Sequence, residues 1–335
     1  YGDANVADYV IENVSTGTGN KKVELKVTAD DGTWDAFIDK LTVNGGAASG
    51  GNTGNQGGNQ GGNTSAAVTI ETSTPSQLLS TNRNVQYGQI KKTQYWSNTC
   101  AKNRNVIVLL PPNYESSKKY PVLYALHGLN QDETFLIGDG NSGFRIMLGN
   151  MIAQGMAEEM IVVFPYIFAS RTMDQASGFD QQSFAAYDNF INELTNDLMP
   201  YIKKTYSVAE GRENTAITGF SMGGRESLYI GYKLQNQIGY VGAIAPAPGL
   251  TPGNDFSGAH QGMISESEFK FAQDPKVLMI CCGTSDSVVG TFPKTYHDIL
   301  TRNGENHYWW EIQGSDHGDP AITNGLYNFC KAIFK

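Results

Sequence analysis

One serine in this chain stands in a pattern typical of an enzymatic nucleophile. Gly219-Phe220-Ser221-Met222-Gly223 matches G-x-S-x-G, in which the serine occupies a strained turn between a strand and a helix. The run Thr215-Ala216-Ile217-Thr218 predicts a strand before the turn, and residues 224–234 favour a helix after it. Glycines are needed in such a turn because side chains there would clash with neighbouring backbone. We therefore expect Ser221 to expose its hydroxyl above a helix N-terminus, whose dipole favours a developing anion.

A serine nucleophile needs a general base, which is most often a histidine. In chains with this turn, the acid and then the histidine follow the serine. The sequence holds five histidines. His317 lies near the chain's end, in the loop Gln313 to Gly318 that follows a predicted strand, Tyr308 to Ile312. We expect His317 to be the base.

The other four histidines fit this role less well. His127 precedes the serine, His297 lies within a predicted helix, and His307 begins a predicted strand. His260 lies in an irregular stretch without a predicted strand before it. Because it follows the serine in the chain, His260 stays the alternative base.

The orienting acid is expected at the end of the strand that precedes the histidine strand. Cys282-Gly283-Thr284-Ser285-Asp286 leaves the predicted strand Val277 to Cys282. A carboxylate at Asp286 can accept a bond from the imidazole, fix its tautomer and stabilise its cationic form. Asp316 is the alternative acid, although neighbours in sequence seldom face one another.

Two backbone amides should hold the oxyanion of an acyl-transfer reaction. One is expected at Met222, directly after the nucleophile. The second is expected in the loop His127-Gly128-Leu129-Asn130, with Leu129 as the donor. His127 is then expected to tie this loop down rather than to take part in the chemistry.

These residues require a scaffold in which strands alternate with helices. That alternation predicts a mainly parallel twisted sheet with helices on both faces. With the G-x-S-x-G turn between a strand and a helix, it indicates an α/β-hydrolase fold. A continuous helix is predicted over residues 183–204, where Tyr187, Phe190, Ile191, Leu194, Leu198 and Ile202 form one apolar stripe. Further helices are expected after Ser221, over residues 292–301, and over residues 326–333. The predicted strands are Val106 to Leu110, Val122 to Leu126, Met160 to Phe164, Thr215 to Phe220, Val241 to Ala245, Val277 to Cys282 and Tyr308 to Ile312.

The chain divides at a segment without apolar residues in a regular pattern. Residues 45–66 are rich in Gly, Asn and Gln and predict a flexible tether. Before it, Val23 to Val27 and Ala36 to Val43 alternate apolar and polar residues, as two β-strands with one buried face do. Two strands cannot form a stable domain alone, so residues 1–44 are expected to be the end of a larger β-module. Residues 67–335 are expected to form the hydrolase domain.

Composition excludes several classes of partner. A net charge of -9 argues against nucleic acid and anionic membranes, whereas a neutral polysaccharide raises no such objection. No apolar run is long enough to span a bilayer. Cys281 and Cys282 are adjacent in an apolar run, which favours buried thiols over a disulfide framework or a metal site. Since the chain opens at Tyr1, we expect it to be a piece of a longer, secreted polypeptide.

Several of these motifs together resemble carbohydrate esterase family 1. That family contains the feruloyl esterase and acetyl xylan esterase domains of xylan-degrading bacteria, and the resemblance covers about residues 85–335. It implies that Ser221, Asp286 and His317 form a catalytic triad. The residues that carry it are Pro111-Pro112, Pro121 to Gly128, Gly219 to Gly224, Cys282 to Ser287 and Gly314 to His317.

The acyl pocket departs from the feruloyl esterases of that family. Clostridial members have a tryptophan shortly after the histidine, where this chain has Pro320-Ala321-Ile322. Ile322 is therefore a candidate substrate-binding residue. Tyr166 and Phe168, after the predicted strand ending at Phe164, are candidates for an aromatic wall in its place.

The N-terminal segment resembles the end of a calcium-dependent xylan-binding module, carbohydrate-binding module family 36, whose fold is a jelly roll. The resemblance lies in Asp30 to Asp39. It implies that Asp30, the Trp34 carbonyl and Asp35 hold a calcium that contacts sugar hydroxyls, and that Asp39 serves a second calcium. Hard oxygen ligands in a short acidic turn suit calcium. An acidic β-turn without a metal is the alternative, because turns favour Asp and Gly in any case.

Together these expectations describe an extracellular serine esterase that acts on xylan side groups through an acyl-enzyme, without a cofactor for catalysis. Feruloyl esterase is the first expectation, and acetyl xylan esterase is the alternative within the same fold. A non-catalytic polysaccharide-binding domain is the alternative from another class.

Overall fold

The computed structural model describes residues 68–137, 143–255 and 258–335. The predictions for residues 1–66 lie outside the described residues. These are the two N-terminal strands, the calcium ligands Asp30, Trp34, Asp35 and Asp39, and the Gly-rich tether.

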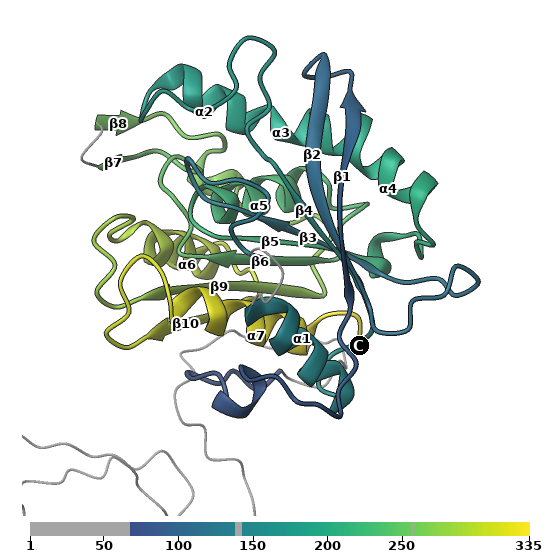
Figure 1. Cartoon of the computed structure of the whole chain (residues 1–335). Helices are drawn as coiled ribbons and strands as arrows, with labels where there is room; N and C mark the ends of the chain where they lie inside the picture. Colours follow the sequence, from purple (N-terminus) through teal and green to yellow (C-terminus); the bar gives the residue numbers. More distant parts are fainter. Residues whose placement is uncertain (1–67, 138–142, 256–257) are drawn as a thin grey trace, which may run out of the picture. The chain divides into compact units, whose positions relative to one another are not determined.

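An eight-stranded sheet forms the scaffold, with strand order β1-β2-β4-β3-β5-β6-β9-β10 (Figure 1). The strands β7 and β8 form a separate hairpin. The strand bounds are β1 (Gln89–Ser97), β2 (Lys102–Leu110), β3 (Val122–Leu126), β4 (Ile161–Pro165), β5 (Thr215–Gly219), β6 (Tyr240–Ile244), β7 (Gly253–Asp255), β8 (Gly258–His260), β9 (Val277–Gly283) and β10 (Tyr308–Ile312).

The six strands from β4 to β10 in that order run parallel, whereas β1 and β2 join one edge in antiparallel pairing. Every residue of β3, β4, β6 and β9 is buried. Such continuous apolar strands are typical of a parallel sheet that is covered on both faces. The carboxyl ends of the parallel strands share one edge, where ligand sites of open α/β sheets usually lie. We call it the carboxyl edge.

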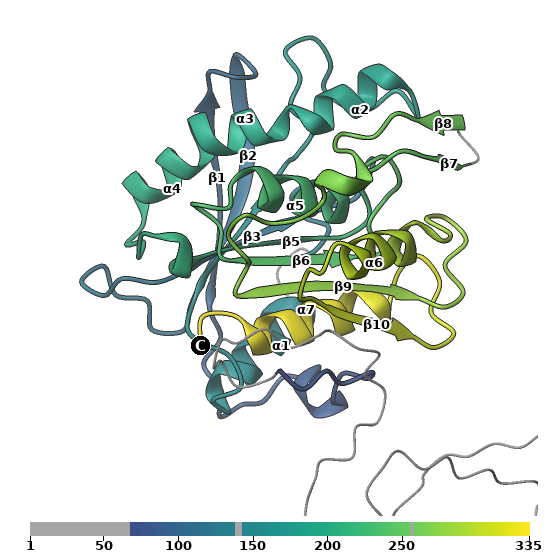
Figure 2. The ribbon, with the colours of Figure 1, turned by 180° about the vertical axis from the view of Figure 1, so that it is seen from behind.

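Helices cover both faces of the sheet. α1 and α7 lie on one face, and α5 and α6 lie on the other, as Figure 1 and the reverse view in Figure 2 show. The helix bounds are α1 (Gly143–Ala153), α2 (Gln181–Asp188), α3 (Phe190–Glu193), α4 (Met199–Thr205), α5 (Met222–Lys233), α6 (Phe292–Arg302) and α7 (Ala321–Ala332), with short 3₁₀ turns at Ser76–Leu78, Arg212–Asn214 and Glu266–Glu268. Within the described residues, no helix is both long and apolar enough to cross a membrane.

The mainly parallel α/β sheet predicted from the sequence is confirmed. β3 and β10 have the predicted bounds, β5 and β9 differ by one residue at their ends, and β4 and β6 are shifted by one residue at both ends. β2 begins four residues earlier than expected. The strand β1, the hairpin β7–β8 and the helix α1 were not predicted.

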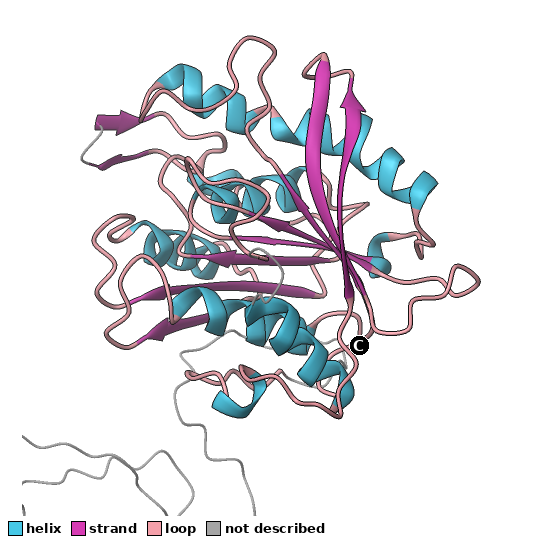
Figure 3. Ribbon diagram, in the orientation of Figure 1, coloured by secondary structure: helices cyan, strands magenta, loops and turns pink. Residues whose placement is uncertain are grey.

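The prediction of one continuous helix over residues 183–204 is wrong. The segment consists of α2, α3, a π-helical turn η2 (Leu194–Leu198) and α4 (Figure 3). The apolar stripe is buried as expected except at Ile191, which is half-buried. The helix changes form because Glu193 and Asp197 also point inward, where both are buried and bonded to residues of β1, β2 and the turn between them. Single π-helical turns of this kind interrupt α-helices elsewhere, often at functional sites.

Candidate active site

Ser221 occupies the turn between β5 and α5 in a conformation that few residues adopt. Its φ is 55° and its ψ is -115°. Neighbouring backbone fixes it there, because its amide donates to the Ile244 carbonyl at 2.9 Å and its carbonyl accepts from the Ala247 amide at 2.9 Å. Backbone strain of about 1–3 kcal/mol persists only where the surroundings over-determine it. The backbone of the serine is therefore fixed at the carboxyl edge, and its hydroxyl is the group available for reaction.

Gly223 allows this turn to lie directly under the end of β3. A Cβ atom at Gly223 would lie 2.3 Å from the Leu126 carbonyl oxygen and 2.5 Å from that of His127. Both neighbours are backbone atoms, which cannot move aside as a flexible side chain can. The second glycine of the G-x-S-x-G pattern thus sets the distance between the serine turn and the loop after β3.

The structure brings Ser221, His317 and Asp286 into one hydrogen-bonded row. Nε2 of His317 lies 2.9 Å from the Ser221 Oγ, and Nδ1 lies 2.7 Å from the Asp286 Oδ2. The alternative acid, Asp316, bonds to neither the imidazole nor the serine. Asp316 is exposed, and its contacts are made through its backbone carbonyl to its own loop. This arrangement can carry a proton from the hydroxyl to the imidazole while the carboxylate fixes the tautomer.

Asp286 is itself held in one orientation. Its side chain is fully buried, and its second oxygen, Oδ1, accepts from the amides of Val288 and Val289 at 3.0 and 3.1 Å. These two bonds fix the orientation of the carboxylate. Oδ2 is therefore left to the imidazole.

The loops that carry the acid and the base pack directly on each other. A Cβ at Gly283 would lie 2.1 Å from the Ser315 carbonyl oxygen, and the Ser285 amide donates to that same oxygen at 3.0 Å. The ring of Phe220 lies 4.6 Å from the ring of His317, centroid to centroid. The imidazole is thus positioned from both neighbouring strands and from the serine turn.

The predicted oxyanion donors lie on either side of the serine. Met222 is the first residue of α5, where an amide has no intrahelical acceptor. The Leu129 amide, in the loop after β3, makes no hydrogen bond within the described part of the chain. The N-terminus of the 12-residue helix α5 adds a partial positive charge at this place.

His127 is buried and connects two loops. Its Nε2 accepts from the Ile167 amide at 3.0 Å, so its Nδ1 carries the proton and donates to the Gly128 carbonyl at 2.7 Å. Burial lowers the pKa of His127 to about 4, which keeps the ring neutral. As expected from the sequence, this histidine ties the loop after β3 and is not within the hydrogen-bonded row.

Gln131 fixes the same loop from its other side, and no sequence pattern indicated this role. Its side-chain oxygen accepts from the Gly128 amide at 2.7 Å. The Gly128 backbone is therefore bonded at both its amide and its carbonyl. This leaves the next amide, that of Leu129, as the loop's free donor.

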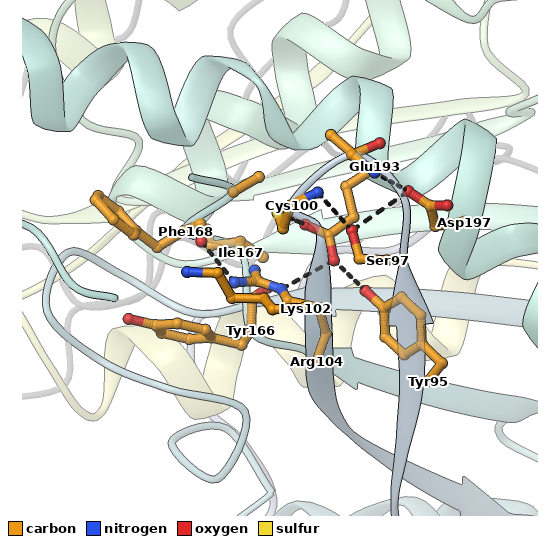
Figure 4. Close-up of polar contacts among 12 residues, drawn as sticks. Tyr95, Ser97, Cys100, Lys102, Arg104, Tyr166, Ile167, Phe168, Glu193 and Asp197 are labelled. Atoms are coloured by element: carbon orange, nitrogen blue, oxygen red, sulfur yellow. Dashed lines mark hydrogen bonds and ion pairs between the residues drawn. The ribbon is translucent and has the colours of Figure 1, made fainter. Parts of the chain in front are cut away.

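A buried ion pair supports the segment that His127 contacts (Figure 4). Arg104 on β2 donates from Nε to Glu193 at 2.9 Å. Its two terminal nitrogens donate to the carbonyls of Phe168 at 2.8 Å and Tyr166 at 2.6 Å. These carbonyls flank Ile167, so the guanidinium holds the amide that fixes His127.

Further donors satisfy the Glu193 carboxylate. Tyr95 donates to Oε1, the oxygen shared with Arg104, and the Cys100 thiol donates to Oε2 at 2.9 Å. Burial raises the pKa of the Tyr95 hydroxyl, and it raises the pKa of Cys100 to about 11, so both stay protonated. No sequence pattern indicated this cluster, because its members come from β1, β2, the turn between them and α3.

The expected substrate-binding residues differ in their exposure. The prediction that Phe168 forms part of an aromatic wall at the surface is wrong. Its side chain is fully buried and packs edge-on against Tyr187. Tyr166 is half-buried and lines a surface hollow. Ile322 is half-buried in the first turn of α7, five residues after His317.

His260 was expected in an irregular stretch, but it ends β8 in the hairpin and its ring packs edge-on against Phe184 and Phe292. The hydrogen-bonded partner of the Ser221 hydroxyl is His317. All four cysteines are buried and free. Among the described residues, no group of three or more His, Cys, Asp or Glu side chains is arranged to hold a metal.

Comparison with known proteins places this geometry in a family. Residues 97–321 match the model of the Esterase family. A CE1 ferulic acid esterase from Anaeromyces mucronatus, solved with ferulic acid, is 46% identical with a TM-score of 0.77, over 80% of this chain and 98% of that one. A feruloyl esterase module from Clostridium thermocellum, solved with sinapinate, has 17% identity and a TM-score of 0.60 over 80% and 95% of the two chains, which shows a similar fold.

Two curated relatives are longer proteins. The endo-1,4-beta-xylanase/feruloyl esterase of Xylanibacter ruminicola is 26% identical over 213 residues, which are 62% of this chain and 26% of that protein. Endo-1,4-beta-xylanase Y of Acetivibrio thermocellus is 27% identical over 174 residues, which are 49% of this chain and 14% of that protein. The chain thus spans about a quarter or less of the length of these relatives.

Proposed function

The chain belongs to the Esterase family and to carbohydrate esterase family 1, and from this premise we propose that it removes feruloyl groups from xylan side chains as a serine carboxylic-ester hydrolase. The observation that best supports the proposal is the row Ser221–His317–Asp286, with a strained serine at the carboxyl edge. The ferulic acid esterase at 46% identity supports the choice of acyl group.

In the first step, the Ser221 Oγ attacks the ester carbonyl carbon while Nε2 of His317 takes the hydroxyl proton. The tetrahedral intermediate then collapses, the bond to the sugar oxygen breaks, and the imidazolium returns its proton to that oxygen. The sugar leaves as a free alcohol, and the feruloyl group stays on the serine.

In the second step, a water molecule attacks the acyl-enzyme. His317 takes a proton from the water and gives it back to the Ser221 oxygen as the acyl bond breaks. Ferulic acid is released and the serine is regenerated. Asp286 stabilises the imidazolium in both steps and keeps its own charge. The route as proposed uses no metal or cofactor.

The amides of Met222 and Leu129 are proposed to bind the oxyanion in both steps. Removing one such donor typically costs about 10²–10³ in kcat. Their positions on either side of Ser221, one at a helix N-terminus and one unpaired in the loop after β3, support this role.

A comparison of two substrates tests the function. The wild type should release ferulate from methyl ferulate and from feruloylated arabinoxylan, and Ser221→Ala should release none above background. Faster release of acetate from acetylated xylan than of ferulate would instead assign the acetyl xylan esterase activity. Release of neither acid would contradict an esterase and leave polysaccharide binding to be tested.

An extracellular location and a calcium site are also proposed, and neither rests on the geometry of the active site. Relatives named as xylan-degrading enzymes support an extracellular polysaccharide substrate. Residues 1–44 are proposed to end a xylan-binding module, with Asp30, Trp34, Asp35 and Asp39 as calcium ligands. Calorimetric titration of calcium into the whole chain should show binding that Asp35→Asn weakens. The absence of any calcium-dependent heat in the wild type would reject the site.

A further inference from the structure

The two sides of the serine differ in chemistry. β5, which ends at the serine turn, lies between β3 and β6 in the sheet. The loops after β3 and β4 therefore lie on one side of Ser221 at the carboxyl edge, and the loops after β6 and β9 lie on the other. A feruloyl ester of a sugar has an aromatic acyl half and a hydroxyl-rich alcohol half, and we expect a different surface beside Ser221 for each.

On the first side there is an open polar hollow of about 440 Å³. We call it the β3–β4 hollow, because residues 130–133 follow β3 and Tyr166 and residues 174–176 follow β4. Amide and carboxylate side chains dominate its lining. Such groups bind sugars through hydrogen bonds to vicinal hydroxyls, whereas they bury an aromatic acyl group poorly.

One wall of the hollow lies close to the serine turn, on the far side of Gly128. The position of a Cβ at Gly128 lies 3.2 Å from the Ser221 Cβ and 2.9 Å from the Gln131 side-chain oxygen. Gln131 is part of the lining of the hollow. Ser221 is not itself part of the lining, so Gly128 separates the serine from the nearest wall of the hollow.

Part of the lining is fixed and part is free to bind. Asp132 accepts from the Thr134 amide and hydroxyl, and Asp174 pairs with Lys102 at 2.8 Å. In contrast, the side chains of Asn130 and Glu133 form no hydrogen bond to any described residue. A rigid wall with unpaired amide and carboxylate groups is suited to recognising hydroxyls.

Asn130 is also held in an uncommon backbone conformation. Its φ is 56°, and its amide donates to the Tyr187 hydroxyl at 3.0 Å. Asparagine is among the few residues that adopt this region with modest strain. The loop therefore keeps the Asn130 carboxamide at the rim of the hollow.

The other side of the serine carries apolar and aromatic side chains. Val288, two residues after Asp286 in the loop after β9, exposes 44% of its surface. Phe184 and Phe292 pack around the β7–β8 hairpin, which follows β6. This side suits the aromatic acyl half of the ester, which leaves the β3–β4 hollow to the alcohol half.

We propose that the β3–β4 hollow binds the saccharide half of the ester, a neutral and hydroxyl-rich sugar, with Asn130 and Glu133 as its contacts. The inference rests on the proposed function, since it assigns the leaving group of that reaction to one surface. The carboxylates of Asp132, Glu133 and Asp174 give the hollow a negative field, which disfavours sugars that carry a carboxylate.

The test uses two esters that differ only in the alcohol. Asn130→Gly removes the carboxamide and suits the positive φ, and Glu133→Gln removes the charge and keeps the shape. With a feruloylated arabinoxylo-oligosaccharide, kcat/KM should fall about tenfold in each variant, through KM, because one hydrogen bond to the sugar is lost or weakened. With methyl ferulate, kcat/KM should stay within about twofold of the wild type, because its alcohol does not reach the hollow.

Asn113→Gly is the matched control. Asn113 is exposed and has a φ of 55°, but it lies in the loop between β2 and β3, at the edge opposite the serine. It should change neither substrate's kinetics. Equal losses on both esters in Asn130→Gly and Glu133→Gln, or no loss on either, would overturn the proposal.

A binding measurement separates this inference from the proposed function. The deacylated arabinoxylo-oligosaccharide should bind to Ser221→Ala in calorimetry, and Asn130→Gly should weaken that binding about tenfold. If the wild type fails to cleave methyl ferulate, the proposed function is wrong. The binding of the oligosaccharide still tests, independently, whether the hollow is a sugar site. No binding of the oligosaccharide by Ser221→Ala would reject the hollow as a sugar site.

Discussion

The Ile167 amide donates to Nε2 of His127 at 3.0 Å and so joins the loop after β4 to the loop after β3. Through the opposite ring nitrogen, His127 holds the Gly128 carbonyl. Arg104 in turn holds the carbonyls on both sides of Ile167. The proposed oxyanion donor at Leu129 thus depends on residues that never meet the substrate.

Asp286→Asn should lower kcat for methyl ferulate by about 10⁴, because an amide at this place favours the wrong imidazole tautomer. Ser221→Ala should lower it at least as far. Steady-state kinetics with the purified variants measures both effects. Thermal melting serves as the control, since Asn replaces Asp with nearly the same volume. Activity retained by Ser221→Ala would place the chemistry elsewhere.

Gly223→Ala should abolish activity and destabilise the fold by about 1–3 kcal/mol or more, because its Cβ would press on two backbone carbonyls after β3. Gly143→Ala is the matched control. Gly143 begins α1, and a Cβ there meets nothing within 4 Å, so this change should stabilise slightly, by about 0.4–1 kcal/mol. Urea unfolding and ferulate release measure the two outcomes. A fully active Gly223→Ala enzyme would show that the close approach does not matter.

The buried His127 should make the protein less stable in acid. The pKa of His127 is lowered to about 4 in the folded state and is about 6.5 when the chain is unfolded, so only the unfolded state gains this proton in between. The stability is present above pH 6.5 and is lost as the pH falls towards 4, with a total of about 3 kcal/mol. Urea unfolding from pH 7 to pH 4 should show a smaller loss in His127→Gln. The same pH dependence in both proteins would contradict the assignment.

Breaking the Arg104–Glu193 pair from one side should cost about 3–5 kcal/mol, because a buried charge is left without its partner. Arg104→Met should also lower kcat, since the segment that holds His127 loses its support. The double variant Arg104→Met/Glu193→Leu should cost less than the sum of the two single changes. The matched control is the exposed pair Lys294–Asp298 on α6, whose removal should cost about 0.5 kcal/mol or less. Additive losses at Arg104 and Glu193, measured in urea, would argue against their coupling.

Much of the scaffold could be predicted because the central strands are continuous apolar runs. β3 was placed at its observed bounds for this reason, and β10, an edge strand that includes the exposed Glu311, was also placed at its observed bounds. β1 was missed because it is an edge strand whose solvent side carries Lys and Gln, which hides the apolar period. The continuous helix was wrong because its apolar stripe gives no sign of the inward Glu193 and Asp197.

The row Ser221–Asp286–His317 was predictable from chain order, since each residue follows a strand of one parallel sheet and strand ends meet at one edge. Arg104, Glu193 and Gln131 were not predictable. Their partners are backbone groups and side chains more than 60 residues away, or a loop amide whose direction depends on the folded turn. A single sequence holds no periodic signal for such contacts.

The central place of β5 in the strand order has a consequence for how this enzyme can change. The acyl half and the alcohol half of the ester would be bound by loops that follow different strands. A change in specificity for one half therefore need not change specificity for the other. Grafting the segment after β3 from a relative should shift sugar preference alone, while the segment after β9 should shift acyl preference alone. Natural selection or directed evolution could then change the acyl specificity and the sugar specificity separately.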